Sequence, residues 1–191
     1  MVKQPRIRPT VIIPDTAPLI HLAAAHALHL LNDMGQVILV DIVAMEATYY
    51  PDKPFAKEIQ DWIDKGLAPG SNAPVQIAES DLGSLYRIAL DQGLKKPRNA
   101  GEIAIAEWLA SELLHFGGPA LVVYENGLVP NLLARQGVAA TVAVATTRNF
   151  LKLAEEAGII IDAEAVWAEI IKKAPTANPA SVIAFIEPNK P

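Results

Sequence analysis

The stretch VIIPDTAPLIHLA (residues 11–23) joins a strand pattern to a helix pattern through a single carboxylate. Three β-branched apolar residues and a proline lead into Asp15, and apolar residues at helical spacing follow at once. This pattern predicts a strand over 11–13 and a helix over 17–31. Pro18 falls in the first turn of that helix, where its missing N–H costs nothing. A buried strand that runs directly into a buried helix is typical of an α/β fold.

The same alternation of strands and helices continues along the chain. Further strands are predicted at 36–40, 75–78, 120–124 and 141–145, with one more candidate at 182–186. Helices are predicted at 43–50, 55–65, 80–92, 100–114, 129–135, 147–157 and, after a cap at Asp162, up to 173. Short apolar strands between helices predict a mostly parallel central sheet covered on both faces, a three-layer α/β/α sandwich. We expect a single domain over residues 1–175 and a C-terminal tail over 176–191.

Composition limits the classes of function that this chain can have. Of its 191 residues, 51% are hydrophobic and 19% are charged, which is enough apolar material for a full-sized core. The net charge of −5 argues against binding nucleic acid by bulk electrostatics. A phosphate chain would therefore have to be held by a local basic patch.

Several kinds of site and location are also disfavoured. Because there is no cysteine, disulfides, thiolate nucleophiles and zinc–sulfur sites are excluded. His21, His26 and His29 do not share one helix face, which argues against a zinc site. No uncharged apolar run reaches the roughly 18 residues of a membrane span. The basic N-terminus also lacks the apolar run of a signal peptide, so we expect a cytoplasmic protein with no membrane partner.

Four acidic residues occupy positions from which they could share one crevice. Asp15 and Glu125 each follow an apolar strand, while Glu46 and Glu102 lie near the starts of helices. Simpler explanations exist: Asp15 could cap a helix and Glu46 could face solvent. Glu102 also fits a capping box, and Glu125 fits a strand-to-helix turn. Because parallel sheets bind ligands beyond the carboxyl ends of their strands, we expect the four carboxylates to converge there.

Four ionised carboxylates in one crevice need a counter-charge. At about 5 Å and an effective dielectric constant of about 20, each pair would repel by roughly 3 kcal/mol. Either some of the carboxylates are protonated or a hard divalent cation neutralises them. Mg²⁺ or Mn²⁺ is the usual partner of all-oxygen sites, and we take the metal as the simpler explanation.

The order of these motifs resembles the PIN-domain family, in particular its compact prokaryotic members, the VapC-type toxins. The resemblance runs from Val11 to about Lys173. It is carried by DTAPLIHLA, VDIVAMEA, NAGEIAIAEWLA, LVVYENGLVPNLLARQGV and the closing VAVATTRNFLKLAEEAGII. It implies a PIN-like domain in which Asp15, Glu46 and Glu102 bind Mg²⁺ or Mn²⁺ to hydrolyse RNA phosphodiester bonds. Related proteins often form homodimers, and a toxin would have an antitoxin protein as its partner.

The fourth acidic position departs from that family. It is usually an aspartate, often a pair, whereas this chain has Glu125 and Asn126. Glutamate keeps the charge one methylene further out, and asparagine offers only a neutral carbonyl, so metal binding would be impaired. We assign Glu125 as the supporting catalytic acid and metal ligand, with Asn126 and Thr16 in supporting roles. The Thr16 hydroxyl could orient a water or the Asp15 carboxylate, and a plain helix cap is the alternative.

Basic residues near the acids would hold the RNA. Lys95, Lys96 and Arg98 come immediately before the Glu102 helix, where an entering phosphate backbone would meet them. A solvated basic loop explains these three residues equally well. Arg148, at the start of a later helix, is a second candidate.

Three functions from different classes follow from these observations. The first is a metal-dependent endoribonuclease, which could be the toxin of a toxin–antitoxin pair. The second is a PIN-like binding or assembly module with weakened catalysis, suggested by Glu125 and Asn126. The third is a haloacid-dehalogenase-like phosphatase, which needs a second aspartate where this chain has Ala17. Because Ala17 disfavours the third function, the first two remain as candidates.

Overall fold

The centre of the fold is a parallel sheet. A computed structural model of the chain describes residues 9–112, 119–125, 127–137, 142–174, 176–178 and 185–186. Within these residues the strands are β1 (Val11–Pro14), β2 (Gln36–Val40), β3 (Val75–Ala78), β4 (Ala120–Tyr124), β5 (Val142–Thr146) and β6 (Phe185–Ile186). The first five pair in parallel in the order β3-β2-β1-β4-β5, and β6 adds to β5 in the antiparallel direction. The mostly parallel sheet is confirmed.

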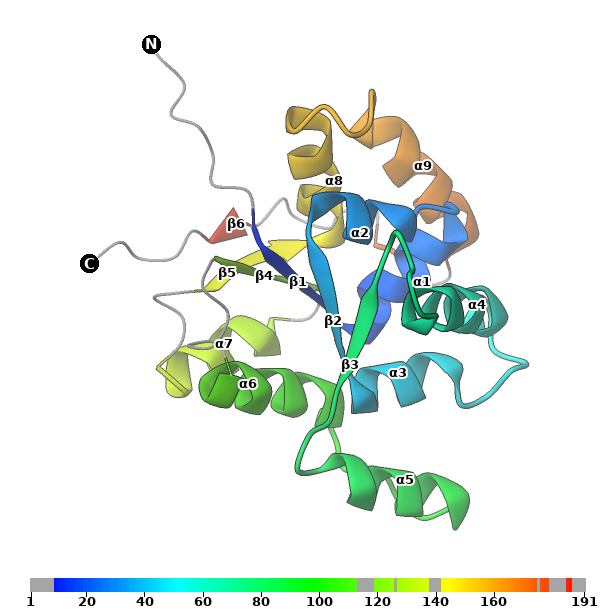
Figure 1. Cartoon of the computed structure of the whole chain (residues 1–191), viewed down its shortest axis with the longest axis vertical. Coiled ribbons are helices and arrows are strands. Elements are labelled where there is room, and N and C mark those ends of the chain that lie inside the picture. The colour runs from blue at the N-terminus through cyan, green and yellow to red at the C-terminus, as the bar shows by residue number, and fades with distance from the viewer. Residues whose placement is uncertain are drawn as a thin grey trace.

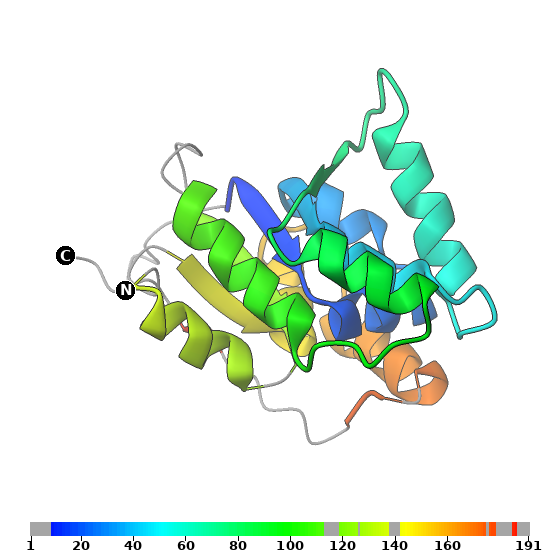
Figure 2. The same cartoon turned by 90° about the horizontal axis from the view of Figure 1, so that it is seen from below.

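Helices cover both faces of this sheet. They are α1 (Thr16–Ala24), α2 (His29–Met34), α3 (Asp41–Thr48), α4 (Ala56–Leu67), α5 (Gly83–Asp91), α6 (Ala100–Glu112), α7 (Leu128–Arg135), α8 (Thr147–Glu156) and α9 (Ala163–Lys173). In Figure 1, α1, α2, α8 and α9 lie on one side of the sheet, and α6 and α7 lie on the other. Figure 2, seen from below, shows α5, α6 and α7 in front of the strands. The three-layer α/β/α sandwich is therefore confirmed.

The central strands are apolar because both of their faces are covered. In β1, Val11, Ile12 and Ile13 are at most 2% exposed, and the last four residues of β2 are fully buried. A strand with helices on both sides has no solvent-facing positions, so apolar and polar residues do not alternate along it.

The strand order places a ligand-binding position beside β1. From β1 the chain builds β2 and β3 outward in one direction, and it then places β4 and β5 on the opposite side of β1. The connections that leave β1 and β4 go to opposite faces, since α1 and α7 lie on different sides of the sheet (Figure 1). In α/β sheets, ligands bind beyond the carboxyl ends of such a strand pair. Asp15 directly follows β1, and Glu125 directly follows β4.

The single helix predicted over 17–31 is wrong, because two helices, α1 and α2, occupy that region. His26 takes the left-handed conformation with φ of 54°. The N–H of Ala27 donates to the carbonyl of Leu22 at 2.8 Å, and the N–H of His26 donates to Ala23 at 2.9 Å. These are the two bonds of a Schellman helix end, which usually has glycine or asparagine at the left-handed position. With histidine there, the apolar periodicity gave no sign of the break.

Most other element boundaries follow the prediction closely. The strands β2, β3 and β4 coincide with the predicted ranges. Asp162 caps α9, since its carboxylate accepts the N–H of Ala165 at 3.0 Å. The tail contributes β6, while the domain boundary at residue 175 stays a prediction. Among the helices that the structure describes, none combines the length and the apolarity needed to cross a bilayer.

Candidate functional site

Asp15 lies at the joint between β1 and α1 with little contact with solvent. Its backbone N–H donates to the carbonyl of Val123 in β4 at 2.8 Å, which fixes it at the carboxyl ends of two strands. It occupies the N-cap position of α1, yet within the described residues its side chain makes no capping hydrogen bond. The residue is only 5% exposed. Helix capping therefore does not account for this buried carboxylate.

The first turn of α6 lies against two of the predicted acids. A Cβ atom on Gly101 would lie 3.1 Å from Oε2 of Glu46 and 3.7 Å from Oδ1 of Asp15. Asp15, which follows β1, and Glu46, which belongs to α3, thus both lie beside Gly101 of α6. Glu102 is the next residue of that turn and is 9% exposed. The fold therefore brings Asp15, Glu46 and Glu102 together from three separate segments.

The carboxylate of Glu46 is held by two hydroxyl groups. Thr16 Oγ1 donates to Oε2 of Glu46 at 2.7 Å, and the Tyr86 hydroxyl donates to Oε1 at 3.1 Å. Burial raises the pKa of Tyr86, and the neighbouring Glu46 charge raises it further, so the phenol stays a donor. The Thr16 hydroxyl therefore orients Glu46, a part-buried residue, and not Asp15 as the sequence suggested.

The neighbouring acids change the ionisation of Asp15. Burial, as the largest cause, and the charge of Glu102 raise the pKa of Asp15 from 3.8 to about 7. This value includes smaller increases from Glu46 and Glu125, and a backbone hydrogen bond from Thr16 that acts in the opposite direction. All three other predicted acids thus lie close enough to act on Asp15.

Glu125 is held by donors from other elements. Its Oε1 accepts the N–H of Thr147 at 3.0 Å and lies 3.5 Å from Nδ1 of His21. Burial acts to raise the pKa of Glu125, but hydrogen bonds from His21 and Thr147 outweigh it and keep the pKa below its usual value. His21 is 1% exposed, packs edge-on against Trp167, and has Nε2 3.1 Å from the Thr176 hydroxyl. Glu125 is therefore ionised and committed in part to these contacts.

The donor chemistry of the site suits a hard divalent cation. Asp15, Glu46 and Glu102 offer carboxylate oxygens, which Mg²⁺ and Mn²⁺ prefer, and the charges of the other acids add to burial in raising the pKa of Asp15. In the described part of the chain, however, no group of three or more histidine, aspartate or glutamate side chains is arranged to hold a metal ion. Binding of a cation would therefore require the carboxylates to rotate toward it.

The predictions for Asn126, as a supporting residue, and for Arg148, as an RNA-binding residue, have different outcomes. Asn126 lies outside the described residues. The guanidinium of Arg148 donates to both carboxylate oxygens of Glu164, at 3.3 Å from Nε and 2.8 Å from Nη2. Arg148 thus forms a bidentate ion pair with Glu164, and its role in RNA binding stays a prediction.

The predicted basic loop between α5 and α6 divides into two kinds of residue. Lys95 and Arg98 are exposed. Lys96 lines a pocket of about 310 Å³ that Glu46 also lines. Among these three cations, Lys96 is the one that shares a pocket with a predicted acid.

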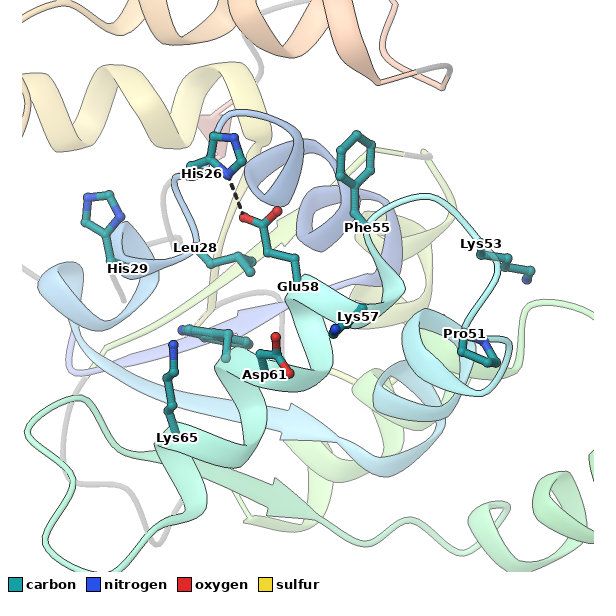
Figure 3. A pocket seen from close by; sticks show the side chains of 11 residues that line it. His26, Leu28, His29, Pro51, Lys53, Phe55, Lys57, Glu58, Asp61 and Lys65 are labelled. Atoms are coloured by element: carbon teal, nitrogen blue, oxygen red, sulfur yellow. Dashed lines mark hydrogen bonds and ion pairs between the residues drawn. The ribbon is translucent and has the colours of Figure 1, made fainter.

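A larger depression lies away from the acids. It has a volume of about 600 Å³ and is bordered by α2, α4 and the turn after α1 (Figure 3). Nδ1 of His26 and Oε1 of Glu58 are joined there at 3.0 Å, and the His26 side chain is 74% exposed. The described residues that line this depression include none of the four predicted acids. The acids themselves thus lie outside it, although Lys53 lines both this depression and the pocket that contains Glu46.

Known proteins offer no relative against which to compare this site. No family model, curated protein or solved structure matches the chain. The resemblance to PIN domains accordingly stays a prediction, and the assignment of function depends on the chemistry of the site itself.

Three residues that shape the site were not among the sequence candidates. Gly101 allows the close approach of two carboxylates, and a glycine inside a predicted helix is a recognised sign of such an approach. His21 was considered only as a zinc ligand, and Tyr86 not at all. His21 and Tyr86 belong to helices whose apolar periodicity does not indicate which carboxylate each side chain contacts.

A fifth carboxylate at the same rim has a structural role. Asp41 directly follows β2, and its Oδ1 accepts the N–H of Ile42 at 2.8 Å and the Ser80 hydroxyl at 2.7 Å. A Cβ on Gly83 would collide with its other oxygen. Asp41 therefore ties the end of β2 to the start of α5, which shows that position at the rim alone does not mark a functional acid.

Proposed function

We propose that this chain is a PIN-like ribonuclease that hydrolyses RNA phosphodiester bonds with the help of Mg²⁺ or Mn²⁺. The observation that carries the proposal is the convergence of Asp15, Glu46 and Glu102 at the carboxyl end of β1. This is the position at which parallel α/β sheets bind ligands. A cluster of carboxylates repels a phosphate directly, so it suits a phosphodiester substrate only through a bound cation.

Each residue of the cluster has a separate task in this proposal. Asp15, Glu46 and Glu102 would hold the cation, which when bound would polarise the scissile phosphate and lower the pKa of the attacking water. Thr16 and Tyr86 restrict the rotation of Glu46, so less conformational freedom remains to be lost on binding. Burial of Asp15 keeps solvent from one side of the site, which strengthens the electrostatic interactions within it.

Cleavage of a labelled single-stranded RNA by the purified protein tests the proposal. The wild type is assayed with Mg²⁺, with Mn²⁺ and with EDTA, beside Asp15→Asn and Glu102→Gln. Asp33→Asn serves as a matched control, because Asp33 is an exposed aspartate of α2. We expect cleavage that needs the metal, is lost in both site variants and is kept in the control. Equal cleavage by the site variants, or no cleavage with either metal, would show that the proposal is wrong.

A binding or assembly module is the second candidate function. It is favoured by the contacts of Glu125, whose charge is already compensated by His21 and by the amide of Thr147. A fourth acid committed in this way contributes less to a metal site than a freely rotating aspartate. The two functions separate in the same assay, because a binding module would retain the RNA in a gel-shift experiment without cleaving it.

The resemblance adds partners to this proposal, and the hydropathy of the sequence adds a location. An antitoxin protein, a homodimer and a cytoplasmic location all stay predictions. Sedimentation of the purified protein, alone and after co-expression with the product of a neighbouring gene, would test the first two.

A further inference from the structure

Two lysines from separate loops lie close to the ring of Tyr50. Nζ of Lys53 lies 5.0 Å from the centroid of this ring, and Nζ of Lys96 lies 5.4 Å from it. Lys53 belongs to the loop before α4 (Figure 3), and Lys96 belongs to the loop before α6. Tyr49 packs edge-on against Tyr50 with centroids 5.0 Å apart, and its hydroxyl donates to Asp91 of α5 at 2.9 Å. The aromatic pair is thus an anchored support for two cations.

Two ammonium groups thus lie close to one ring, in a pocket whose lining also includes Glu46. In the part of the chain that the structure describes, neither Lys53 nor Lys96 forms an ion pair. The face of an aromatic ring attracts a cation but carries no net charge, so Tyr50 compensates their repulsion only in part. Tyr50 is also 41% exposed, which leaves the group open to solvent. Two like charges held together in this way attract an anion.

The same two lysines line the pocket that contains Glu46. Thr16 and Tyr86, the residues that hold the Glu46 carboxylate, line it as well. A single space of about 310 Å³ therefore joins a pair of cations to Glu46, one of the proposed metal-binding acids. An anion that occupies both parts needs more than one negative group along its length.

We infer that Tyr50, Lys53 and Lys96 form a subsite for a backbone phosphate of a single-stranded nucleic acid, next to the phosphate at the acidic cluster. The inference rests on the proposed function, because the acids would act on that neighbouring phosphate. A strand carries phosphates at successive positions along its length, so one would lie between the lysines and its neighbour at the acidic cluster, whereas inorganic phosphate carries only one such group. Of the three cations predicted on the loop before α6, the subsite includes Lys96 alone.

RNA binding in the absence of cleavage tests this subsite. Fluorescence anisotropy of a labelled single-stranded RNA in EDTA compares the wild type with the double variant Lys53→Ala/Lys96→Ala. We expect the double variant to bind roughly tenfold more weakly, and the slope of log Kd against log salt to fall by about 0.7, the value for one lost phosphate contact on a single strand. The control Lys57→Ala/Lys65→Ala removes the same two charges from exposed positions of α4 and should leave the slope unchanged.

Substitution of the aromatic residue tests its supporting role. Tyr50→Ala removes the ring that brings the lysines together and should weaken RNA binding. Tyr50→Phe keeps the ring and should restore it. Thermal unfolding of each variant confirms that the fold is kept. If Tyr50→Ala binds as the wild type does, the ring has no part in the subsite.

The outcomes separate this inference from the proposed function. Metal-dependent cleavage with an unchanged salt slope in the double variant would overturn the subsite and leave the nuclease intact. A reduced slope without cleavage under any metal would support the subsite and overturn the nuclease. If inorganic phosphate or a mononucleotide binds as tightly as the strand, or an acidic peptide binds in its place, the assignment to a nucleic-acid strand is wrong.

Discussion

Asp15 and Glu125 follow neighbouring strands of one sheet, yet their carboxylates have opposite environments. Burial and three other carboxylates raise the pKa of Asp15 to about 7. Burial also acts on Glu125, but His21 and Thr147 supply hydrogen bonds that keep its pKa below the usual value. Sheet topology thus places a carboxylate at the rim, while donors from other elements decide whether its charge is compensated. We expect the uncompensated charge of Asp15 to be the one that requires a cation.

The largest expected effect comes from removing the charge of Asp15. The folded protein keeps the proton of Asp15 up to about pH 7, whereas the unfolded chain releases it near 3.8. Between these values the folded state binds more protons, so the free energy of unfolding of the wild type falls as pH rises, by up to about 4 kcal/mol. Asp15→Asn removes this penalty and should be more stable than the wild type by up to that amount at about pH 8.

Urea unfolding across the pH range in EDTA measures this effect. The advantage of Asp15→Asn should disappear below about pH 4, where the carboxyl group of the wild type is neutral in both states. Asp33→Asn should follow the wild type throughout. Parallel curves for Asp15→Asn and the wild type would show that Asp15 is not in an acidic environment.

Removing the charge of Glu125 should change the free energy of unfolding in the opposite direction, toward lower stability. Glu125→Gln replaces the charged acceptor of the Thr147 amide and His21, and it should lose about 1–2 kcal/mol of stability at neutral pH. Because the pKa of Glu125 is lowered in the folded state, this contribution is present above its usual value of 4.5. It is lost as pH falls through the lower folded-state value. The same urea series would contradict the comparison if Glu125→Gln stabilised the protein as Asp15→Asn does.

Gly101→Ala should separate activity from stability. Its Cβ would lie 3.1 Å from Oε2 of Glu46, so the carboxylate has to shift by a few tenths of an ångström. The helix gains up to about 1 kcal/mol from the alanine, which offsets the strain, and the net change in stability should stay within about 1 kcal/mol. RNA cleavage should fall by roughly tenfold, because catalytic geometry is sensitive to such shifts.

Gly127→Ala is the control for this substitution. A Cβ on Gly127 meets no described atom within 4 Å, so the control should leave cleavage unchanged. If Gly101→Ala cleaves RNA as the wild type does, the position of Glu46 beside Asp15 does not matter for the reaction.

The sheet could be predicted from the sequence because central parallel strands are continuous apolar runs. The runs QVILV and ALVVY coincide with the central strands β2 and β4, and the shorter run VQIA, with an exposed Gln76, coincides with the edge strand β3. The break between α1 and α2 could not be predicted, because it depends on a left-handed His26 and not on a glycine. The strands follow from their own apolar residues. The end of α1 depends on backbone hydrogen bonds that the apolar pattern does not indicate.

The site was predictable in position but not in its electrostatics. Asp15 was identified from its place after a strand, and parallel strands meet at one edge, so convergence with the other acids followed from topology. The partners of Glu125 and Glu46 could not be predicted. His21 reaches Glu125 from α1, and Tyr86 reaches Glu46 from α5, across sequence separations that only the folded chain closes.

Titration calorimetry of Mn²⁺ binding tests most directly whether these carboxylates form a cation site. The wild type and Asp33→Asn should each show one saturable site in the absence of RNA, and Asp15→Asn should lose it. Because Asp15 holds a proton up to about pH 7, binding at about pH 6 should also release a proton, seen as a dependence of the heat on the buffer. Equal Mn²⁺ binding by the wild type and Asp15→Asn, or none by the wild type, would contradict the account.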